Sequence, residues 1–445
     1  MGTAPYGPTA IVPSATAIAL AYAAMLIRDP IHGDISLGRL ETAVLDCAAV
    51  QRMRGIKQLG TASLVYPGAV HTRFDHSLGA SAVSHRIVAA LRRDGVDVPR
   101  ELEELVAVGA LLHDVTHVPF GHTLEDERRL FPRHDKGTRL ARLLDGELGA
   151  ALTRIGIRAA VADLLGVGPP TLPLWARDVI ASTIDADLLD YLRRDSYFAG
   201  LAHDYDDRVF HYFTVADGHL ALHMAKHGMD RPDARSEVIQ LLRMRYFLTE
   251  RVYYHHTKIV AGAMISKAVE LALDHGALAE GDLLALNDWT LLDRLEHSGV
   301  PPVAALIARL QRRDLLKRGY VVSAHGVGAE RRAELVRRFH ESRPQRGAAE
   351  TQLAAALGRP VEEVIIYCPA LTVMKEASAR VTTSRGLRRL NDRGDAAVAE
   401  ISALEERYAN LWRLYVFVPP DTAARAAIVA AELFGHPSEY GAPPS

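Results

Sequence analysis

The sequence has few of the features that mark secreted, disulfide-stabilised or nucleic-acid-binding proteins. Its 445 residues include only two cysteines, Cys47 and Cys368, which are too few for a disulfide framework and lack the paired spacing of a zinc ribbon. Lysine and arginine together number 52 against 54 acidic residues, so the net charge is not that of a nucleic-acid binder. We therefore predict a cytoplasmic protein with no nucleic-acid partner.

The sequence also lacks a hydrophobic run long enough to span a membrane. Residues 10–24 are apolar, but the run is short for a bilayer, and no lysine or arginine precedes it as in a signal peptide. From Met25 onward, MLIRDPIHGDISL reads as an ordinary folded segment. We expect residues 1–24 to be an N-terminal extension that is disordered or not native, and we predict no membrane partner.

The composition indicates a helical protein with more than one core. Hydrophobic residues make up 49% of the chain and charged residues 24%, which is typical of a globular protein. Alanine, leucine and arginine dominate, and all three favour helix. A chain of this length is longer than a single hydrophobic core usually accommodates. We therefore predict a helical domain at residues 25–275 and a smaller mixed α/β lobe at residues 276–445.

Hydrophobic periodicity places the secondary structure within these two parts. Apolar residues at helical spacing predict helices at residues 42–59, 77–91, 101–112, 135–144, 174–194 and 236–275. Short β-branched and aromatic runs predict strands at residues 319–324, 363–369 and 414–420. We expect the weakest order at residues 343–350 and in the last ten residues. The fold class is therefore mainly α.

The clearest chemical signal is a cluster of histidines. Seven of the 20 histidines lie between His71 and His134, interleaved with aspartate and glutamate, whereas an isolated histidine is usually a surface or core residue. Within this cluster, His113 and Asp114 follow an apolar helix, where ionisable side chains are costly without a partner. Imidazole and carboxylate together suit Fe, Mn, Co, Zn or Ni, so the sequence predicts a divalent transition metal.

Three segments in order resemble a known family. HTRFDHS, LLHDVTHVPFGH and IDADLLDYLRRD resemble the spaced histidine and aspartate motifs of the HD-superfamily phosphohydrolases. DPIHGDISL, DCAAVQRMRGIKQLG and VYPGAVHTRFDHSLG are similar to its deoxynucleotide triphosphohydrolase branch. The similarity runs from about Leu26 to Lys267 and implies an HD-domain helical bundle.

The resemblance implies a catalytic centre in which a water activated by the metal attacks phosphorus. The metal ligands of the family correspond to His76, His113, Asp114 and Asp187. Its acid–base pair corresponds to His122 and Glu125, in which the imidazole protonates the departing 5′-oxygen. The alternative for Glu125 is an exposed carboxylate that pairs with Arg128 or Arg129.

The resemblance also implies a nucleotide pocket. The phosphate contacts of the family correspond to Arg73, His117, His134, Arg245 and His255. Its sugar contacts correspond to Gln58, Leu59, Tyr191, Asp195 and Tyr253, with the two tyrosines leaving no room for a 2′-hydroxyl. Alternatives remain for some of these: Arg73 and Arg245 could lie on a solvated face, the tyrosines could be core residues, and His256 could replace His255.

Two positions depart from the pattern of this branch. Leu188 stands where a phosphate-binding lysine is expected, which weakens the case for a triphosphate substrate. Asp46, Gln51 and Arg54 match part of a nucleotide regulatory site, but Met25 stands at the position of its first lysine. Those three residues could instead form a network at a helix start.

We therefore carry several functional hypotheses forward. The first is hydrolysis of deoxynucleoside triphosphates to deoxynucleoside plus triphosphate, with Mg²⁺ as a further ion on the substrate phosphates. The second is stepwise phosphate removal from another nucleotide, or cleavage of a phosphodiester. The third is an inactive nucleotide-binding regulator, and a di-iron oxygenase is disfavoured. By analogy with the family we expect a homo-oligomer.

Overall fold

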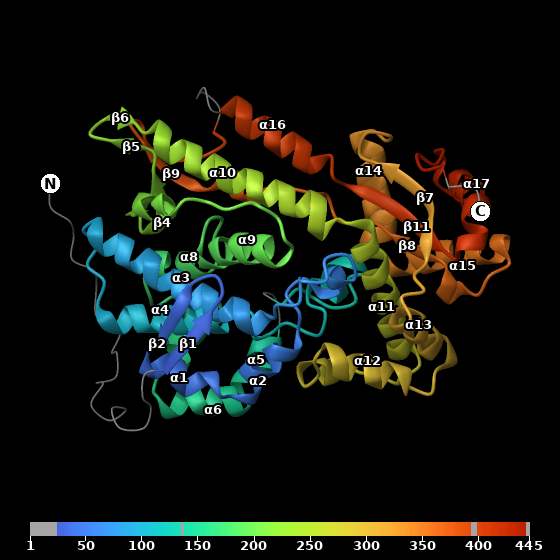
Figure 1. Ribbon diagram of the computed structural model, residues 1–445, viewed down its shortest axis with the longest axis horizontal. Helices are drawn as coiled ribbons and strands as arrows, with labels where there is room; N and C mark the ends of the chain where they lie inside the picture. Colours follow the sequence, from blue (N-terminus) through green and yellow to red (C-terminus); the bar gives the residue numbers. More distant parts are fainter. Residues whose placement is uncertain (1–24, 135–137, 393–397, 442–445) are drawn as a thin grey trace.

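The computed structural model describes residues 25–134, 138–392 and 398–441, so the predicted extension at residues 1–24 lies outside the described residues. The fold is mainly α with a mixed α/β C-terminal region, as the sequence predicted. Figure 1 shows the earlier helices (blue to green) packed together, with most of the orange C-terminal elements grouped beyond α11 (His256–Asp274).

The first part of the chain is a helical bundle with several short strands. Its helices are α1 (Arg39–Leu45), α2 (Ala48–Gln51), α3 (Arg73–Arg93), α4 (Arg100–Leu112), α5 (Arg139–Leu144), α6 (Glu147–Arg154), α7 (Arg158–Leu164), α8 (Leu174–Ile180), α9 (Ala186–Phe198) and α10 (Pro232–Leu248). Its strands are β1 (Met25–Asp29), β2 (Gly33–Leu37), β3 (Phe213–Ala216), β4 (His219–His223), β5 (Ala225–Lys226) and β6 (Met229–Asp230). Single π-helical turns occur at Thr123–Glu127 and Thr249–Tyr253.

The second part combines helices with a three-stranded antiparallel sheet. Its helices after α11 are α12 (Asp288–Glu296), α13 (Pro301–Gln311), α14 (Ala329–Leu335), α15 (Arg343–Leu357), α16 (Val398–Ala409) and α17 (Ala423–Phe434). Its strands are β7 (Lys317–Ser323), β8 (Ile365–Tyr367), β9 (Arg380–Thr383), β10 (Gly386–Arg389) and β11 (Arg413–Val418). The sheet has the order β7-β11-β8, so the three predicted strands form one sheet.

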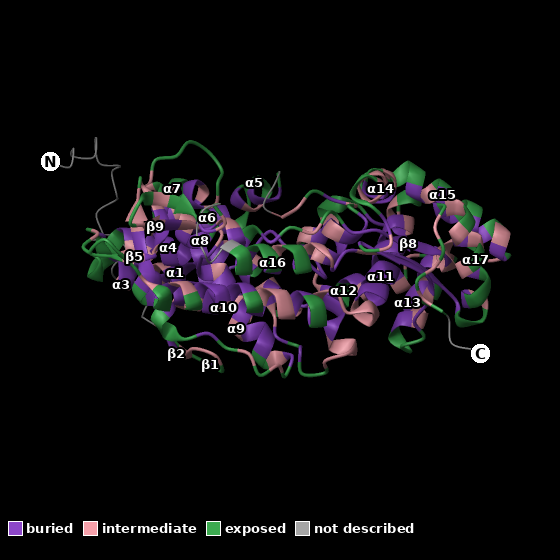
Figure 2. Ribbon diagram, turned by 90° about the horizontal axis from the view of Figure 1, so that it is seen from above, coloured by how far each residue is buried: buried purple, intermediate pink, exposed green. Residues whose placement is uncertain are grey.

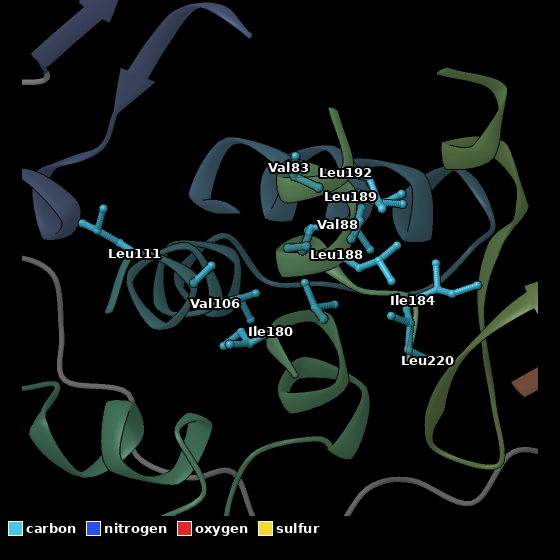
Figure 3. Packing of buried hydrophobic residues seen from close by; sticks show 14 of the residues in the cluster. Val83, Val88, Val106, Leu111, Ile180, Ile184, Leu188, Leu189, Leu192 and Leu220 are labelled. Atoms are coloured by element: carbon cyan, nitrogen blue, oxygen red, sulfur yellow. The ribbon is translucent and has the colours of Figure 1, made fainter. Parts of the chain in front are cut away.

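The bundle core lies where α3, α4 and α9 pack together. Figure 3 shows Val83 of α3, Val106 of α4 and Leu189 of α9 within this core. All three side chains are fully buried. Because apolar residues recur every three or four positions in these helices, each helix presents one continuous apolar face to the other two. The ends of the three helices are thereby fixed relative to one another.

The three-stranded sheet is buried on both faces, as alternation along its strands shows. On β11, Leu414 and Val416 belong to the core beneath α15 and α17, whereas Tyr415 and Phe417 belong to the core around α11 and α13. Successive side chains of a strand point to opposite faces, so this sheet has helices on both sides. In Figure 2 the buried residues around β8 and α11 form a second mass beside the bundle.

The two parts are joined more closely than a boundary at residue 275 implies. Helix α11 precedes that position, yet its residues pack in the core of the C-terminal sheet. Conversely, β9 pairs in parallel with β4, with Val381 opposite Leu222, and α16 lies along α10 (Figure 1). The C-terminal region therefore completes the bundle as well as forming its own core.

The predicted helix at residues 174–194 is wrong as a single element, because α8 and α9 are separated at residues 181–185. Asp185 has an extended backbone, and its carboxylate accepts hydrogen bonds from the amides of Leu188 at 2.8 Å and Ser182 at 2.5 Å. The bond from Leu188 satisfies an amide at the start of α9, and the bond from Ser182 fixes the connection that precedes it. The break places Asp187 in the first turn of a new helix.

Two other predicted helices are also interrupted. Residues 42–59 form α1, α2 and a 3₁₀ turn (Arg52–Gly55), because Cys47 is extended. Residues 236–275 change direction at the turn Thr249–Tyr253, after which His255 caps α11 by accepting a hydrogen bond from the Thr257 amide at 3.2 Å. The expectation of weak order at residues 343–350 is wrong, since these residues begin α15.

Candidate functional site

The four predicted metal ligands meet where α4 ends and where α3 and α9 begin. His76 lies in the first turn of α3, His113 and Asp114 directly follow α4, and Asp187 lies in the first turn of α9. His76 Nε2 is 2.9 Å from Asp187 Oδ1 and 3.2 Å from His113 Nε2, and His113 Nε2 is 3.5 Å from Asp114 Oδ1. The four donor groups thus converge on one small volume.

The hydrogen bonds of the two histidines orient them as metal ligands. His113 Nδ1 donates to the Ala110 carbonyl at 2.7 Å, and His76 Nδ1 donates to Asp190 Oδ2 at 2.7 Å. Because both Nδ1 atoms are used as donors, the Nε2 atom of each ring is the one available to a cation, and the two Nε2 atoms lie 3.2 Å apart. Although burial lowers the pKa of His76, Asp187 and Asp190 raise it to about 10, so the cluster attracts positive charge. This donor set therefore fits a divalent transition metal.

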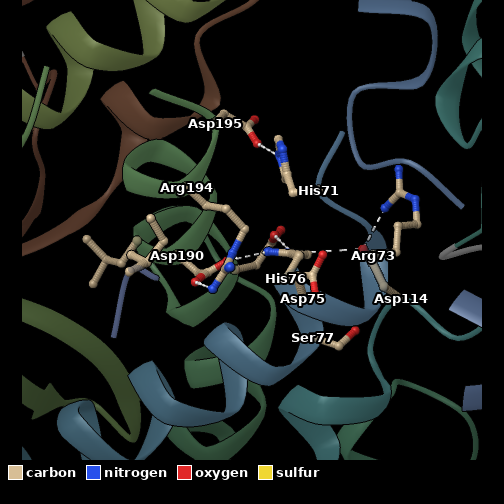
Figure 4. Close-up of polar contacts among 12 residues, drawn as sticks. His71, Arg73, Asp75, His76, Ser77, Asp114, Asp190, Arg194 and Asp195 are labelled. Atoms are coloured by element: carbon tan, nitrogen blue, oxygen red, sulfur yellow. Dashed lines mark hydrogen bonds and ion pairs between the residues drawn. The ribbon is translucent and has the colours of Figure 1, made fainter. Parts of the chain in front are cut away.

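Asp190 orients His76 by accepting its Nδ1 hydrogen bond, and this residue was missed by the sequence analysis. Arg194 donates to its two oxygens at 2.8 and 2.9 Å (Figure 4). His32 Nε2 lies 2.7 Å from Oδ1. Gly79 is required beside it, because a Cβ there would lie 1.9 Å from Asp190 Oδ1. The available signal was its spacing, since residues three apart on a helix share a face with Asp187.

Asp114 is held by two of the predicted phosphate contacts. Arg73 donates to its Oδ2 at 2.5 Å (Figure 4), and His117 Nε2 lies 3.1 Å from its Oδ1. Burial raises the pKa of this carboxyl, but Arg73 and His113 lower it well below its usual range. The His117 ring stacks on His134 with 3.6 Å between centroids. Asp114 is therefore ionised, as a metal ligand must be.

The predicted general acid, His122, has two carboxylates nearby. Its Nδ1 lies 3.2 Å from Asp126 Oδ2 and 3.7 Å from Glu125 Oε2, and its side chain is 44% exposed. Asp126 is therefore the closer acid. Burial raises the pKa of Asp126, yet His122 lowers it to about 2.

Glu125 is buried rather than exposed, so its alternative interpretation as a surface carboxylate paired with Arg128 or Arg129 is wrong. Arg139 donates to its Oε1 at 2.5 Å, and His134 Nδ1 lies 3.1 Å from its Oε2. The carboxylate thereby links His134 to the same π-helical turn that follows His122.

A cavity of about 1440 Å³ opens onto this cluster. The predicted site residues that line it are Gln58, Leu59, Arg73, His113, Asp114, His122, His134, Asp187, Tyr191, Asp195, Arg245 and Tyr253. His76, His117 and Glu125 are buried behind the wall. The structure therefore brings residues from five separate segments of the bundle around one space.

On one side of the cavity, an aspartate lies among aromatic rings. Asp195 accepts a hydrogen bond from the Tyr253 hydroxyl at 2.7 Å and is 2.8 Å from His71 Nε2. The Arg245 guanidinium lies 5.3 Å from the centroid of Tyr191 and 5.2 Å from that of Tyr253. These rings and Asp195 form a wall with a polar acceptor, which suits a sugar.

His255 lies outside this group. Its Nδ1 is used to cap α11, its ring stacks on His256 at 4.6 Å, and neither ring lines the cavity in the described part of the chain. Lys258, one turn further along α11, lines the cavity instead. Sequence reasoning missed this lysine because the side chain that faces inward depends on where α11 begins.

The C-terminal region forms part of the cavity wall. Leu371, Thr372 and Val373, in the segment after β8, line the cavity, and so does Tyr408 of α16. The predicted regulatory residues are engaged elsewhere: Arg54 Nε donates to Gln51 Oε1 at 2.8 Å. This local contact favours the helix-start alternative for that group.

No helix within residues 25–134, 138–392 and 398–441 is both long and apolar enough to cross a membrane.

Two family models match the chain. The HD domain matches residues 73–195, and the HD associated region matches residues 236–440. The first match contains all four candidate metal ligands, and the second contains the C-terminal wall of the cavity.

Several known proteins are similar in sequence. The uncharacterized protein MJ1154 of Methanocaldococcus jannaschii is 28% identical over 89% of this chain and 79% of its own length. The deoxynucleoside triphosphate triphosphohydrolase SAMHD1 of Bos taurus is 27% identical over 56% of this chain, and the match spans 48% of that protein. The SAMHD1 homolog of Dictyostelium discoideum is 25% identical over 66% of this chain and 59% of its own length.

Solved structures show that the fold is known. A phosphohydrolase from Bacteroides thetaiotaomicron aligns with 89% of this chain and 100% of its own, with a TM-score of 0.67 and 22% identity. A hypothetical protein from Aquifex aeolicus aligns with 92% of this chain and 100% of its own, with a TM-score of 0.68 and 22% identity. At these identities the likeness describes the fold alone.

Proposed function

This chain belongs to the HD-domain phosphohydrolases, and on that premise we propose that it cleaves deoxynucleoside triphosphates to a deoxynucleoside and triphosphate. The observation that carries the proposal is the position of Asp195, which lies between Tyr253 and His71 on the cavity that also reaches Asp114 and Asp187. A sugar hydroxyl on Asp195 would leave the phosphates to extend toward the histidine cluster. SAMHD1, a relative, is named as a deoxynucleoside triphosphate triphosphohydrolase.

The donor set of His76, His113, Asp114 and Asp187 would hold a divalent metal. When bound, such an ion lowers the pKa of a water molecule and withdraws electrons from phosphorus. Fe, Mn, Co, Zn and Ni all suit imidazole and carboxylate donors. Mg²⁺ would accompany the phosphates of the substrate.

Side chains of the protein assist the cleavage itself. Attack of water on the α-phosphorus breaks its bond to the 5′-oxygen, and the triphosphate separates from the nucleoside. His122, exposed to the cavity beside Asp126, donates a proton to the departing 5′-oxygen, a contribution of about 10² to 10⁴ in rate. Arg73 and Arg245 donate charge-assisted hydrogen bonds to phosphate oxygens.

The test is to incubate the purified protein with Mn²⁺ or Co²⁺ and each deoxynucleoside triphosphate, then separate the products. Free deoxynucleoside with intact triphosphate supports the proposal, and orthophosphate with nucleoside diphosphate contradicts it. Asp187→Ala should abolish turnover because it removes a metal ligand. Asp230→Ala, at an exposed position on β6, is the matched control and should retain it.

The second candidate is stepwise removal of phosphate from another nucleotide, or cleavage of a phosphodiester. Leu188 favours it, because an apolar side chain lines the cavity where the related branch has a cation. The same product separation distinguishes the two reactions. An inactive nucleotide-binding regulator would give no product with any nucleotide, while still binding one.

A homo-oligomer in the cytoplasm stays a prediction. Sedimentation of the purified protein with and without a nucleotide would test the assembly.

A further inference from the structure

The cations on the cavity wall differ in how firmly they are paired. Arg73 donates to Asp114 at 2.5 Å, whereas Arg245 Nε lies 3.3 Å from Glu376 Oε1 without a hydrogen bond. Lys258 Nζ lies 3.5 Å from Glu127 Oε1, at the outer limit of a hydrogen bond. Elsewhere on the same helix, Lys267 donates to Glu350 at 2.7 Å. Lys258 is therefore held only loosely by its acid.

Glu127 has an unusual environment for a buried carboxylate. It is 5% exposed, and neither of its oxygens has a hydrogen-bond partner among the described residues. Gly262 of α11 leaves the space for it, since a Cβ at that position would lie 2.6 Å from both oxygens. A buried polar group without partners is rare in native structures and calls for an explanation.

The backbone and the side chain of Lys258 contact two different segments of the candidate active site. Its backbone carbonyl accepts a hydrogen bond from the Thr61 hydroxyl at 2.8 Å, which ties it to the segment that carries Gln58. Its acid, Glu127, ends the π-helical turn that begins just after His122. Lys258 and Glu127 both line the cavity, so their ion pair lies at the cavity wall.

We propose that Lys258 binds the terminal phosphates of a polyphosphate substrate and that Glu127 is a positioning residue that holds its ammonium group at the cavity wall. The inference rests on the proposed function and identifies a cation that can replace the one missing at Leu188. A lysine ammonium is a compact charge on a flexible stem, so it can turn from a loosely held carboxylate to a phosphate oxygen. A tightly paired lysine such as Lys267 could not do so without leaving a buried charge unpaired.

The first measurement is calorimetric titration of the whole protein with inorganic tripolyphosphate. Lys258→Met should weaken binding about tenfold to a hundredfold, as expected for loss of a hydrogen bond to a charged group. Lys258→Arg should restore most of the affinity because it keeps the charge. Lys226→Met, at an exposed position on β5, is the matched control and should bind as the wild type does.

The second measurement is steady-state kinetics with a deoxynucleoside triphosphate and with the corresponding monophosphate as a competitive inhibitor. Lys258→Met should raise KM for the triphosphate by a similar factor and leave the inhibition constant of the monophosphate within about twofold. Glu127→Gln should raise KM to a smaller extent, with kcat unchanged. A merely structural role for either residue would instead lower kcat together with the thermal midpoint.

The outcomes separate this inference from the proposed function. If the wild type releases intact triphosphate but Lys258→Met binds tripolyphosphate as tightly as Lys226→Met does, the inference is wrong and the function stands. If tripolyphosphate binding depends on Lys258 but the enzyme releases orthophosphate, the phosphate site stands and the proposed reaction is wrong. A thermal midpoint of Lys258→Met equal to that of the wild type excludes misfolding as the cause of a loss.

Discussion

Glu350 and Glu127 are two buried glutamates that pack against the same helix, α11, and their surroundings are opposite. Glu350 accepts hydrogen bonds from Arg128 at 2.7 Å, Lys267 at 2.7 Å and the Ile366 amide at 3.0 Å. Glu127 accepts none from the described residues. Both are shielded from water, so donors and not burial distinguish them.

The pKa values of the two carboxyls express this difference. Burial raises both, but Arg128 and Lys267 lower the pKa of Glu350 to about 2, whereas that of Glu127 is raised to about 7 despite Lys258. A carboxylate with several donors stabilises the packing of the elements that supply them, and Glu350 does so between α11 and α15. A buried carboxylate that accepts no hydrogen bond and lies 3.5 Å from its single lysine costs stability in the free protein, and groups with perturbed pKa values are concentrated at functional sites.

The largest expected effect on stability concerns Glu350. Glu350→Gln should lower the free energy of unfolding by about 3 to 5 kcal/mol, because it leaves Lys267 buried without its counter-charge and Arg128 paired with Glu270 alone. Urea denaturation at pH 7 measures the change. Glu330→Gln, at an exposed position, is the matched control, and a loss as small as that of the control would show that Glu350 does not stabilise the packing of α11 against α15.

At acid pH, Glu350 should lose its contribution to the free energy of unfolding. Its folded-state pKa is depressed below the ordinary 4.5, so its contribution is fully present above that pH and is lost as the pH falls toward 2. The difference in unfolding free energy between wild type and Glu350→Gln should therefore shrink in this window. A difference that stays constant down to pH 3 would contradict the assignment.

The next effect, of opposite sign, concerns Glu127. Because its folded-state pKa is raised from 4.5 to about 7, the folded protein binds the extra proton between these values, and stability falls as the pH rises through them. Glu127→Gln removes this cost and should stabilise the protein at pH 8 by up to about 3 kcal/mol, and by almost nothing at pH 4.5. Urea denaturation at both pH values measures the change, and equal stabilities at pH 8 would refute the prediction.

The sequence predicted the parts of the fold that depend on local patterns. Helices α3 and α4 and the strands β7, β8 and β11 were located because long apolar faces and β-branched runs specify them. The break before α9 was missed because a single side chain, Asp185, outweighs the apolar periodicity on both sides of it. The pairing of β4 with β9 was missed because it joins segments about 160 residues apart.

The candidate site shows the same limit. His76, His113, Asp114 and Asp187 could be proposed from ordered motifs, because each motif is local and their order along the chain is characteristic. Lys258 could not, since its role depends on the register of α11 against the turn that carries Glu127. Polar neighbours across such a contact leave no pattern in either segment alone.

The smallest expected effect concerns Gly262 of α11, which leaves space for the Glu127 carboxylate. In the wild type, Gly262→Ala gains about 1 kcal/mol of helix propensity, but the new Cβ meets the carboxylate at 2.6 Å and forces it to move. With Glu127→Ala already present, this conflict is gone, and Gly262→Ala should stabilise the protein by the full propensity gain. A double-mutant cycle in urea should therefore give a coupling energy of about 1 kcal/mol between the two positions. A coupling near zero would mean that Glu127 leaves this position at no cost, and that Gly262 does not hold the carboxylate against Lys258.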